Sequence, residues 1–491
     1  MRILAIFWVV LLFGCSGGCA GAGSESGAAI EHGGGESSHA ASGGDAAATG
    51  GEARPRIAGP LAPAHPAQRG QWLGAAPLSH TMLRGGDGAT HLGVWVDVPR
   101  DAAGDVPRPP MAISLVIDAS GSMAGEKIRH ARMAASRLVD SLSDGDVVGL
   151  YTFADRVQEI ALPTTVGPDS RRHLLRMISE VRSGGSTALH AGVATGQREL
   201  RRVSTQSHPI RRVLVISDGL ANVGPSRPED FAHLARQGAH EGIQVSAIGV
   251  GLDYSEHTLG ALALNSEGRM YHLEHSEQLA SILDSELNLL SQTVALNAVV
   301  ELSPSAGVTL EGLEVGRAEH VGRRLRIPLG ALYAGQEREL LVRARVSTEA
   351  GDIRELASVR LTYDLADRSR SADQQVVLRY GVTDDTGAVE ASYDSRVESL
   401  LASHRAAEKQ ERAAEMLNRG ESQQAALVLE EAEADLQVAV QKAPAMKKGR
   451  LREARRKVGK RKVKAAAART RAESRGQALE AYDDAMGLRG Y

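Results

Sequence analysis

Cysteine is almost absent from this sequence of 491 residues. The two cysteines, Cys15 and Cys19, both lie near the N-terminus, so no disulfide can cross-link the body of the chain. A chain of this length does not need one, because its domains can bury enough apolar surface unaided. Zinc sites built on several thiolates are excluded from the folded body for the same reason.

Long hydrophobic runs are also missing. The apolar stretch Ile3–Phe13 covers only 11 residues, and no other segment approaches the roughly 18 that a membrane-spanning helix needs. We therefore expect no transmembrane helix in the mature chain. The sequence also lacks a Gly-x-Ser-x-Gly elbow and a Walker-type Gly-Lys-Ser/Thr loop, two motifs that mark serine hydrolases and nucleotide hydrolases.

The first residues predict export. A positive start followed by the short run Ile3–Phe13 suits the core of a signal peptide. The stretch Leu12–Cys15 resembles a bacterial lipoprotein signal, although Phe13 replaces the usual small residue. This resemblance implies a signal peptide over 1–15 and a lipid on Cys15.

Two alternatives to this anchor stay open. Cys19 is a second candidate for the lipid, and plain secretion after cleavage at a nearby small residue is the other. We expect a lipid-anchored protein of the bacterial cell envelope, otherwise a periplasmic or secreted one. Because Ser16 and not Asp follows Cys15, resemblance to known sorting signals favours the outer membrane.

Residues 16–75 predict a tether. They are rich in Gly, Ala, Ser and Pro and contain hardly any large apolar residue. Such a segment buries too little surface to offset the entropy lost on ordering. The scattered histidines His32, His39 and His65 are interpreted as polar filler of this tether and not as metal ligands.

Three oxygen-rich segments stand out in the middle of the chain. Asp118-Ala-Ser-Gly-Ser122 follows the apolar run 113–117, and Ser217-Asp218-Gly219 follows the apolar run 213–216. Between them, Ser186-Thr187 follows two glycines. Carboxylate and hydroxyl oxygens that converge on one point are the ligands that Mg²⁺ and Mn²⁺ prefer.

These segments resemble the metal-ion-dependent adhesion site of the von Willebrand factor A (VWA) domain, whose motif is Asp-x-Ser-x-Ser followed by a distant Thr and a distant Asp. The five matching residues occur in the family's order: Asp118, Ser120, Ser122, Thr187 and Asp218. The resemblance implies a VWA domain over 109–295, a divalent cation (Mg²⁺, or else Mn²⁺ or Ca²⁺), and binding of a protein ligand without catalysis.

Periodicity alone predicts an α/β fold. Short β-branched runs alternate with helical patterns, and runs such as 213–216 show no polar alternation, so their strands are expected to be covered on both faces. This alternation is typical of a doubly wound, mostly parallel sheet. Ligands of such sheets bind beyond the carboxyl ends of the strands, where Asp118 and Asp218 lie. The expected strands are 112–117, 147–153, 212–217, 244–250 and 269–273.

Two further regions flank this domain. Period-2 runs over 296–385 predict a small β-sandwich, completed by strands within 76–108, so that the α/β domain is inserted into it. Residues 386–491 are predicted to be helical. They begin with a hairpin whose first helix stops near Gly420 and whose second helix is capped by Ser422 and ended by a proline.

A basic run, Lys447–Arg471, contains 13 Lys or Arg against the single acid Glu453. It predicts either attraction to an anionic envelope surface or a helix folded back on the protein's own acids, and the two remain open. No aromatic residue interleaves the basic ones, which removes the stacking expected of single-strand binders. Because export to the envelope is predicted, we expect no nucleic acid partner. Membrane contact is expected through the lipid anchor only.

The ligand chemistry favours binding over catalysis. Three neutral hydroxyls as direct ligands leave the cation electrophilic, so that an Asp or Glu of a partner completes its octahedron. The alternative is a metallohydrolase, for which His190 is the nearest candidate base in the sequence. A third hypothesis is a scaffold that works with a cytoplasmic ATPase. The predicted signal sequence argues against it.

Overall fold

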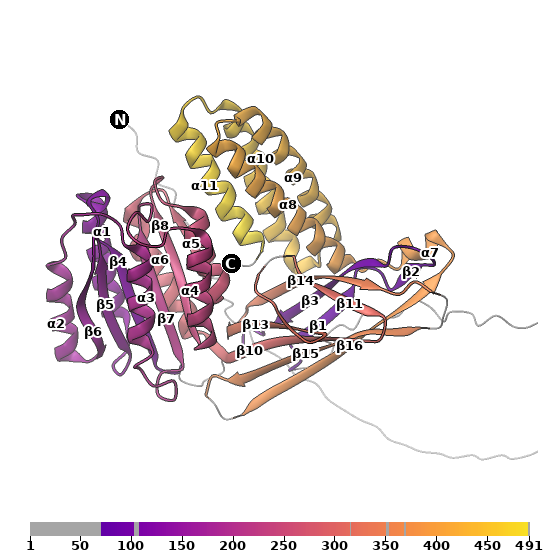
Figure 1. The fold of residues 1–491 in the computed structure, drawn as a ribbon, viewed down its shortest axis with the longest axis horizontal. Coiled ribbons are helices and arrows are strands. Elements are labelled where there is room, and N and C mark those ends of the chain that lie inside the picture. Colours follow the sequence, from indigo (N-terminus) through magenta and orange to yellow (C-terminus); the bar gives the residue numbers. More distant parts are fainter. Residues whose placement is uncertain (1–69, 103–107, 315, 350–352, 368–369, 490–491) are drawn as a thin grey trace, which may run out of the picture. The chain divides into compact units, whose positions relative to one another are not determined.

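The computed structural model describes residues 70–489, apart from 103–107, 315, 350–352 and 368–369. The described chain contains an α/β region, a β-sandwich and a helical region (Figure 1). Among the described residues, no helix has the length and apolar character that crossing a bilayer requires.

A six-stranded sheet forms the α/β region, in the order β6-β5-β4-β7-β8-β9. Its strands are β4 (Met111–Asp118), β5 (Val147–Phe153), β6 (Val157–Thr165), β7 (Ile210–Ser217), β8 (Ile243–Val250) and β9 (Met270–Leu273). All pairs are parallel except β5 with β6. Every residue of β4, β5, β7 and β8 is buried, which confirms the predicted mostly parallel sheet covered on both faces.

Helices cover both faces of this sheet (Figure 1). One face packs on α1 (Glu126–Ser141), α2 (Pro168–Ser179) and α6 (Leu279–Ser291), and the other on α3 (Leu189–Leu200), α4 (Pro228–His240) and α5 (Glu256–Ser266). Alternate residues of β4 serve the two cores: Ile113 and Leu115 face α1, whereas Ala112 and Val116 face α3. Two short 3₁₀ turns, η1 (Gly121–Met123) and η2 (Ser276–Gln278), complete the region.

Strand β6 was not predicted from the sequence. It lies at the edge of the sheet, paired only with β5, and most of its residues are partly or fully exposed. An edge strand with Pro163 near its end has neither the continuous apolar run of a central strand nor clean alternation. The antiparallel pairing with β5 therefore became apparent only in three dimensions.

The β-sandwich consists of two antiparallel sheets around one core, apart from the short parallel pairing of β16 with β2. One sheet contains β1 (Leu73–Pro77), β3 (Ala89–Asp97), β14 (Glu337–Val346) and β11 (Val308–Leu313). The other contains β12 (Glu319–Val321), β13 (Arg324–Tyr333), β10 (Thr293–Pro304), β15 (Arg354–Leu365), β16 (Ser371–Thr383) and β2 (Thr81–Leu83). Because β3 pairs with β14, the α/β region is an insertion between β3 and β10.

The start of the sandwich corrects one predicted boundary. The signal peptide, Cys15 and residues of the tether up to 69 lie outside the described residues. Strand β1 (Leu73–Pro77) begins inside the range 16–75 that was predicted as tether, and all five of its residues are buried. Trp72 stacks on Tyr363 just before this strand, so the sandwich includes residues before 75.

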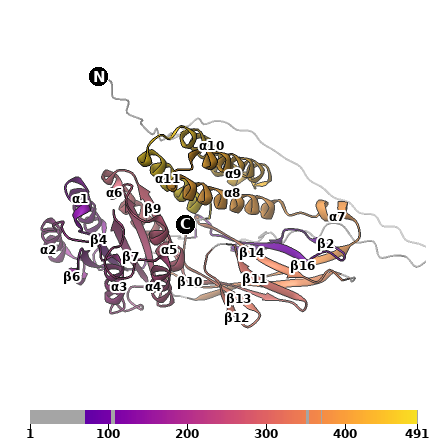
Figure 2. The ribbon, with the colours of Figure 1, turned by 45° about the horizontal axis from the view of Figure 1, so that its top comes forward.

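The helical region comprises more than the predicted hairpin and basic tail (Figure 2). Its helices are α7 (Thr386–Ala391), α8 (Ser395–Asn418), α9 (Ser422–Lys442), α10 (Ala445–Ala467) and α11 (Arg471–Leu488). Gly420, at φ +81°, ends α8 as expected. The predicted cap was wrong: Ser422 is the first residue of α9, and Glu421 precedes it without a side-chain capping bond.

The basic run is largely helix α10, and it does fold against acids of neighbouring elements. Arg461 pairs with Glu480 and Asp484 of α11, and Lys462 pairs with Glu433 of α9. Further ion pairs to neighbouring elements involve Lys447, Arg455 and Lys457. Other cations of the run have no ion pair in the described structure: Lys448, Arg450, Arg452, Lys460, Lys464, Arg469 and Arg471.

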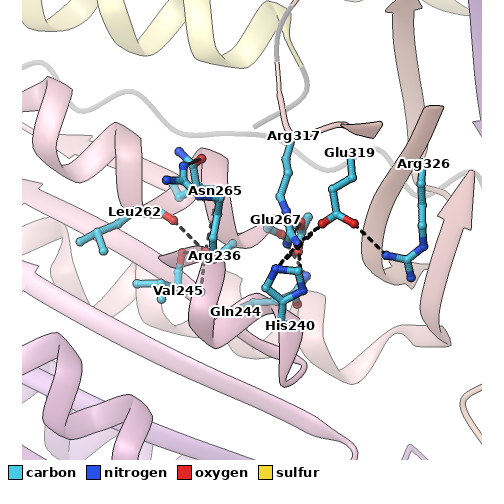
Figure 3. A network of polar contacts seen from close by, with 12 residues as sticks. Arg236, His240, Gln244, Val245, Leu262, Asn265, Glu267, Arg317, Glu319 and Arg326 are labelled. Atoms are coloured by element: carbon cyan, nitrogen blue, oxygen red, sulfur yellow. Dashed lines mark hydrogen bonds and ion pairs between the residues drawn. The ribbon is translucent and has the colours of Figure 1, made fainter. Parts of the chain in front are cut away.

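A charged network joins the end of α5 to the sandwich (Figure 3). Arg317 pairs with Glu319, and its Nη1 lies 3.5 Å from Oε1 of Glu267. Arg326 donates to Glu319 over 3.1 Å, and Arg317 also contacts His240 at the end of α4. Burial raises the pKa of Glu267 to about 7, against the opposing charge of Arg317. The charge of this network therefore changes near neutral pH.

Candidate metal centre

Three loops meet at the carboxyl edge of the α/β sheet. Asp118 ends β4, Asp218 directly follows β7, and Thr187 lies just before α3. Backbone hydrogen bonds fasten the loops together, since the N–H of Gly121 donates to the carbonyl of Gly185 over 2.9 Å. The five residues predicted as metal ligands are thus brought to one place, as expected for parallel strands that end at one edge.

Asp118 is fully buried, and the protein occupies both of its carboxylate oxygens. Oδ1 accepts from the backbone N–H of Ser120 over 2.8 Å, and Oδ2 accepts from the hydroxyl of Ser217 over 2.6 Å. Burial raises the pKa of Asp118, and the nearby charge of Asp218 adds to the rise, while the hydrogen bonds oppose it. Asp118 therefore orients Ser120 and carries a charge that a bound cation would stabilise.

The hydroxyls of Ser120 and Ser122 form a chain with Asp218. Their Oγ atoms are 2.9 Å apart, and Ser122 donates to Oδ1 of Asp218 over 2.7 Å. Adjacent ligand oxygens of a Mg²⁺ octahedron, with bonds of about 2.0–2.1 Å, are separated by about 2.9 Å. Ser120 and Asp218, at the two ends of the chain, are buried, whereas Ser122 between them is exposed and brings the chain to the surface.

Thr187 completes the group of hydroxyls. A Cβ placed on Gly219 would lie 3.4 Å from Oγ of Ser122 and 3.6 Å from Oγ1 of Thr187, so both hydroxyls border the same small space. The backbone N–H of Thr187 donates to the side chain of Asn222 over 2.7 Å, and its carbonyl accepts from the backbone of Asn222 over 3.1 Å. Asn222, which sequence reasoning did not select, thus fixes the position of Thr187.

Lys127 is a second residue that sequence reasoning missed. It lies in the first turn of α1, and its Nζ donates to Oδ2 of Asp218 over 2.5 Å. The side chain of Asp218 is fully buried, so Lys127 compensates a charge that water cannot solvate. In the sequence, a lysine nine residues after Asp118 looks like an ordinary surface cation. The turn η1 between the two residues lets the start of α1 approach Asp218.

The donor set fits a hard divalent cation. The five predicted ligands offer only hydroxyl and carboxylate oxygens, and two of the hydroxyls already have the spacing of neighbouring ligands. Among the described residues, this site included, no group of three or more His, Cys, Asp or Glu could hold a metal ion, so a cation here would rest mainly on hydroxyl oxygens. His190 packs edge-on against Phe231, between α3 and α4, and burial lowers its pKa.

Residues 112–285 match the sequence model of the von Willebrand factor type A domain. This region is a VWA domain. The match covers the sheet from β4 to β9 and contains all five predicted ligands. VWA domains commonly carry a divalent cation at this edge and serve protein interaction, which is the general function that the domain indicates here.

Several curated proteins are similar to this chain. The inter-alpha-trypsin inhibitor heavy chain H3 of Mesocricetus auratus is 27% identical over 217 residues, which cover 41% of this chain and 24% of that protein. The uncharacterized protein YfbK of Escherichia coli (strain K12) is 26% identical over 258 residues, covering 50% of this chain and 44% of that protein. This chain thus spans between a quarter and a half of the length of these relatives.

Solved structures share the fold beyond the VWA domain. A von Willebrand factor type A protein from Catenulispora acidiphila superposes with a TM-score of 0.67 at 16% identity, covering 84% of this chain and 96% of that one. The ArnB paralog VWA2 from Sulfolobus acidocaldarius gives a TM-score of 0.55 at 17% identity over 83% and 96%. Because the VWA match covers far less of the chain, the likeness includes flanking regions, and it concerns the fold alone.

Proposed function

We propose that this protein binds a partner protein through a divalent cation at the VWA site, as an adhesion or scaffold protein of the cell envelope. The observation that carries the proposal is the chain of hydroxyls from buried Ser120 to exposed Ser122, bordered by Thr187. A cation bound there would supply positive charge and an open coordination position for an Asp or Glu of the partner.

The residues of the site have distinct roles in this proposal. Ser120, Ser122 and Thr187 would be direct ligands, each neutral, while Asp118 orients Ser120 through its backbone N–H. Asp218 accepts from Ser122, and Lys127 compensates its charge. Little uncompensated negative charge then remains beside the cation, so an incoming carboxylate gains more here than at a carboxylate-rich site.

Thr187→Ala tests the proposal, because it removes one ligand without changing net charge. We expect capture of envelope proteins by the wild type to need Mg²⁺, to vanish in EDTA and to persist in moderate salt, since a short shielded contact is little screened. Thr187→Ala should lose this capture. Thr164→Ala, on strand β6, is the matched control and should retain it.

Two results would contradict the proposal. Capture that survives EDTA but is lost in moderate salt would make the exposed cations of Lys447–Arg471 the adhesive element, because contacts between exposed charges are screened over about 8–10 Å. Metal-dependent turnover in a hydrolase screen, lost in Thr187→Ala, would favour the metallohydrolase alternative.

Cys15→Ala tests the proposed anchor. A lipid on Cys15 would hold the protein on the envelope, and we expect wild-type protein to fractionate with membranes and to incorporate labelled fatty acid. Cys15→Ala should lose the label and leave the membrane fraction, whereas Cys19→Ala should behave as wild type. Equal partition of the Cys15→Ala protein, with no label on either form, would refute the anchor.

A further inference from the structure

A groove of about 640 Å³ lies beside the metal centre. One wall comes from the loops after β7 and β8, which contribute Leu220 and Leu252, and the other from the ends of α8 and α11, with Leu417 and Arg471. None of the five predicted ligands lines this groove, so it is a surface separate from the metal centre.

The groove begins next to the predicted ligands. Leu220 is two residues after Asp218, a span of at most about 7 Å. On the other side, Nζ of Lys127 contacts Asp218 and lies 3.7 Å from the point where a Cβ on Gly251 would stand, one residue before Leu252. Leu220 and Leu252 thus lie near the site on the loops that follow two different strands.

The apolar part of the groove is open to solvent. Leu220 is 58% exposed, and Leu252 is half-buried. Both leucines therefore leave apolar area on the wall of the groove that a bound segment can bury. The two leucines can cover one apolar side chain of a bound segment.

The far end of the groove is cationic. Arg471 is exposed and has no ion pair in the described structure, although Asp253 also lines the groove. A second hollow of about 500 Å³ shares Leu417 and Arg471 with the groove and adds Arg469, also exposed and without an ion pair. The groove therefore has apolar side chains on one wall and Arg471 on the other, and Arg469 lies in the hollow that continues it.

The walls of the groove are fixed before any partner arrives. Arg475 of α11 donates to both carboxylate oxygens of Glu256 and to the carbonyls of Leu252 and Tyr254. These contacts join the loop after β8 to α11, so the groove is a preformed surface.

We propose that this groove binds an extended segment of the partner protein, in which the metal-binding Asp or Glu is followed two positions later by an apolar residue and four positions later by a second acidic residue, so that all three side chains lie on one face. The apolar side chain lies against Leu220 and Leu252, and the second acid pairs with Arg471. This inference rests on the proposed function, because the first acid needs the cation.

A display library of extended peptides with one fixed Asp and randomised flanks is the probe. Selection on wild-type protein in Mg²⁺ should enrich an apolar residue two positions after the Asp and an acid four positions after it. Arg471→Glu should weaken binding of such a peptide about fivefold, the effect of one exposed ion pair. Leu220→Ser should weaken it about tenfold through lost apolar burial.

Matched controls are the exposed residues Lys460 of α10 and Leu427 of α9, outside the groove. Lys460→Glu and Leu427→Ser should leave the affinity unchanged. One contrary result is the selection of Mg²⁺-dependent peptides that lack the flanking preference, and another is peptides whose affinities Arg471→Glu and Leu220→Ser do not alter. Either result would overturn the proposed binding in the groove and leave the proposed metal-dependent function standing. The absence of any Mg²⁺-dependent peptide would overturn both.

Discussion

Asp218→Asn is expected to weaken Mn²⁺ binding by about 10- to 100-fold, the usual cost of losing a group that orients metal ligands. The carboxylate accepts from Ser122 and is fully buried, so the amide loses negative charge at the position nearest the exposed ligand. Asp118→Asn should have an effect of similar size, because the amide cannot accept from both Ser120 and Ser217. Isothermal titration with Mn²⁺ measures both losses.

The same two variants should differ in stability without metal. Burial makes ionised Asp118 unfavourable, whereas the amide loses one of the two hydrogen bonds that the carboxylate accepts, so Asp118→Asn should lower the free energy of unfolding at neutral pH by less than Asp218→Asn does. Asp218→Asn should lower it, because Lys127 loses the carboxylate it contacts. Asp144→Asn, an exposed aspartate paired with Arg171, is the control for both measurements. Unchanged Mn²⁺ affinity in both site variants would refute the assignment of the metal centre.

Arg475→Ala is expected to lower the free energy of unfolding by about 3–5 kcal/mol, the cost of breaking a buried ion pair by removing one partner. Its partner Glu256 is 4% exposed and would be left buried and charged. The contacts of Arg475 with the carbonyls of Leu252 and Tyr254 would be lost as well. Denaturant unfolding measures the change.

The effect of Arg475→Ala should depend on pH in a defined direction. Burial alone would raise the pKa of Glu256, but the hydrogen bonds and charge of Arg475 outweigh it and keep the pKa below its usual 4.5. The pair therefore stabilises the fold above that pH, and its contribution is lost as the pH falls through the lowered pKa. The difference in free energy of unfolding between wild type and Arg475→Ala should therefore decrease as the pH is lowered.

Arg471→Ala is the control for that measurement, because Arg471 begins the same helix and is exposed without an ion pair. It should change the free energy of unfolding by less than about 0.5 kcal/mol. A loss in Arg475→Ala no greater than in Arg471→Ala would show that the buried pair does not hold α11 on the VWA domain.

Features that depend on local sequence were predictable. The continuous apolar runs of β4 and β7 predicted covered strands, and the structure buries every residue of both. Because parallel strands end at one edge, Asp118 and Asp218 could be placed together before the structure was known. The spacing of the serines around Gly121 likewise allowed Ser120 and Ser122 to converge on one point.

Features that depend on contacts between distant parts of the chain could not be predicted. Strand β6 could not be predicted, because most of its residues are partly or fully exposed and follow no regular pattern. Only its pairing with β5 defines it as an edge strand. The basic run left two readings open, and the structure shows both ion-paired cations, such as Arg461, and exposed ones without an ion pair, such as Lys460. A cation's sequence neighbours do not tell whether an acid from another helix will reach it.

By itself, the sequence determined the fold class of the VWA region and the identity of the candidate ligands, because strand burial and ligand type both depend on short runs of residues. Tertiary structure alone decided which other side chains act on those ligands. Lys127 reaches Asp218, and Asn222 positions Thr187. It also decided that Arg475 joins α11 to the loop beside the site, since a contact across 219 residues to Glu256 leaves no pattern in either segment.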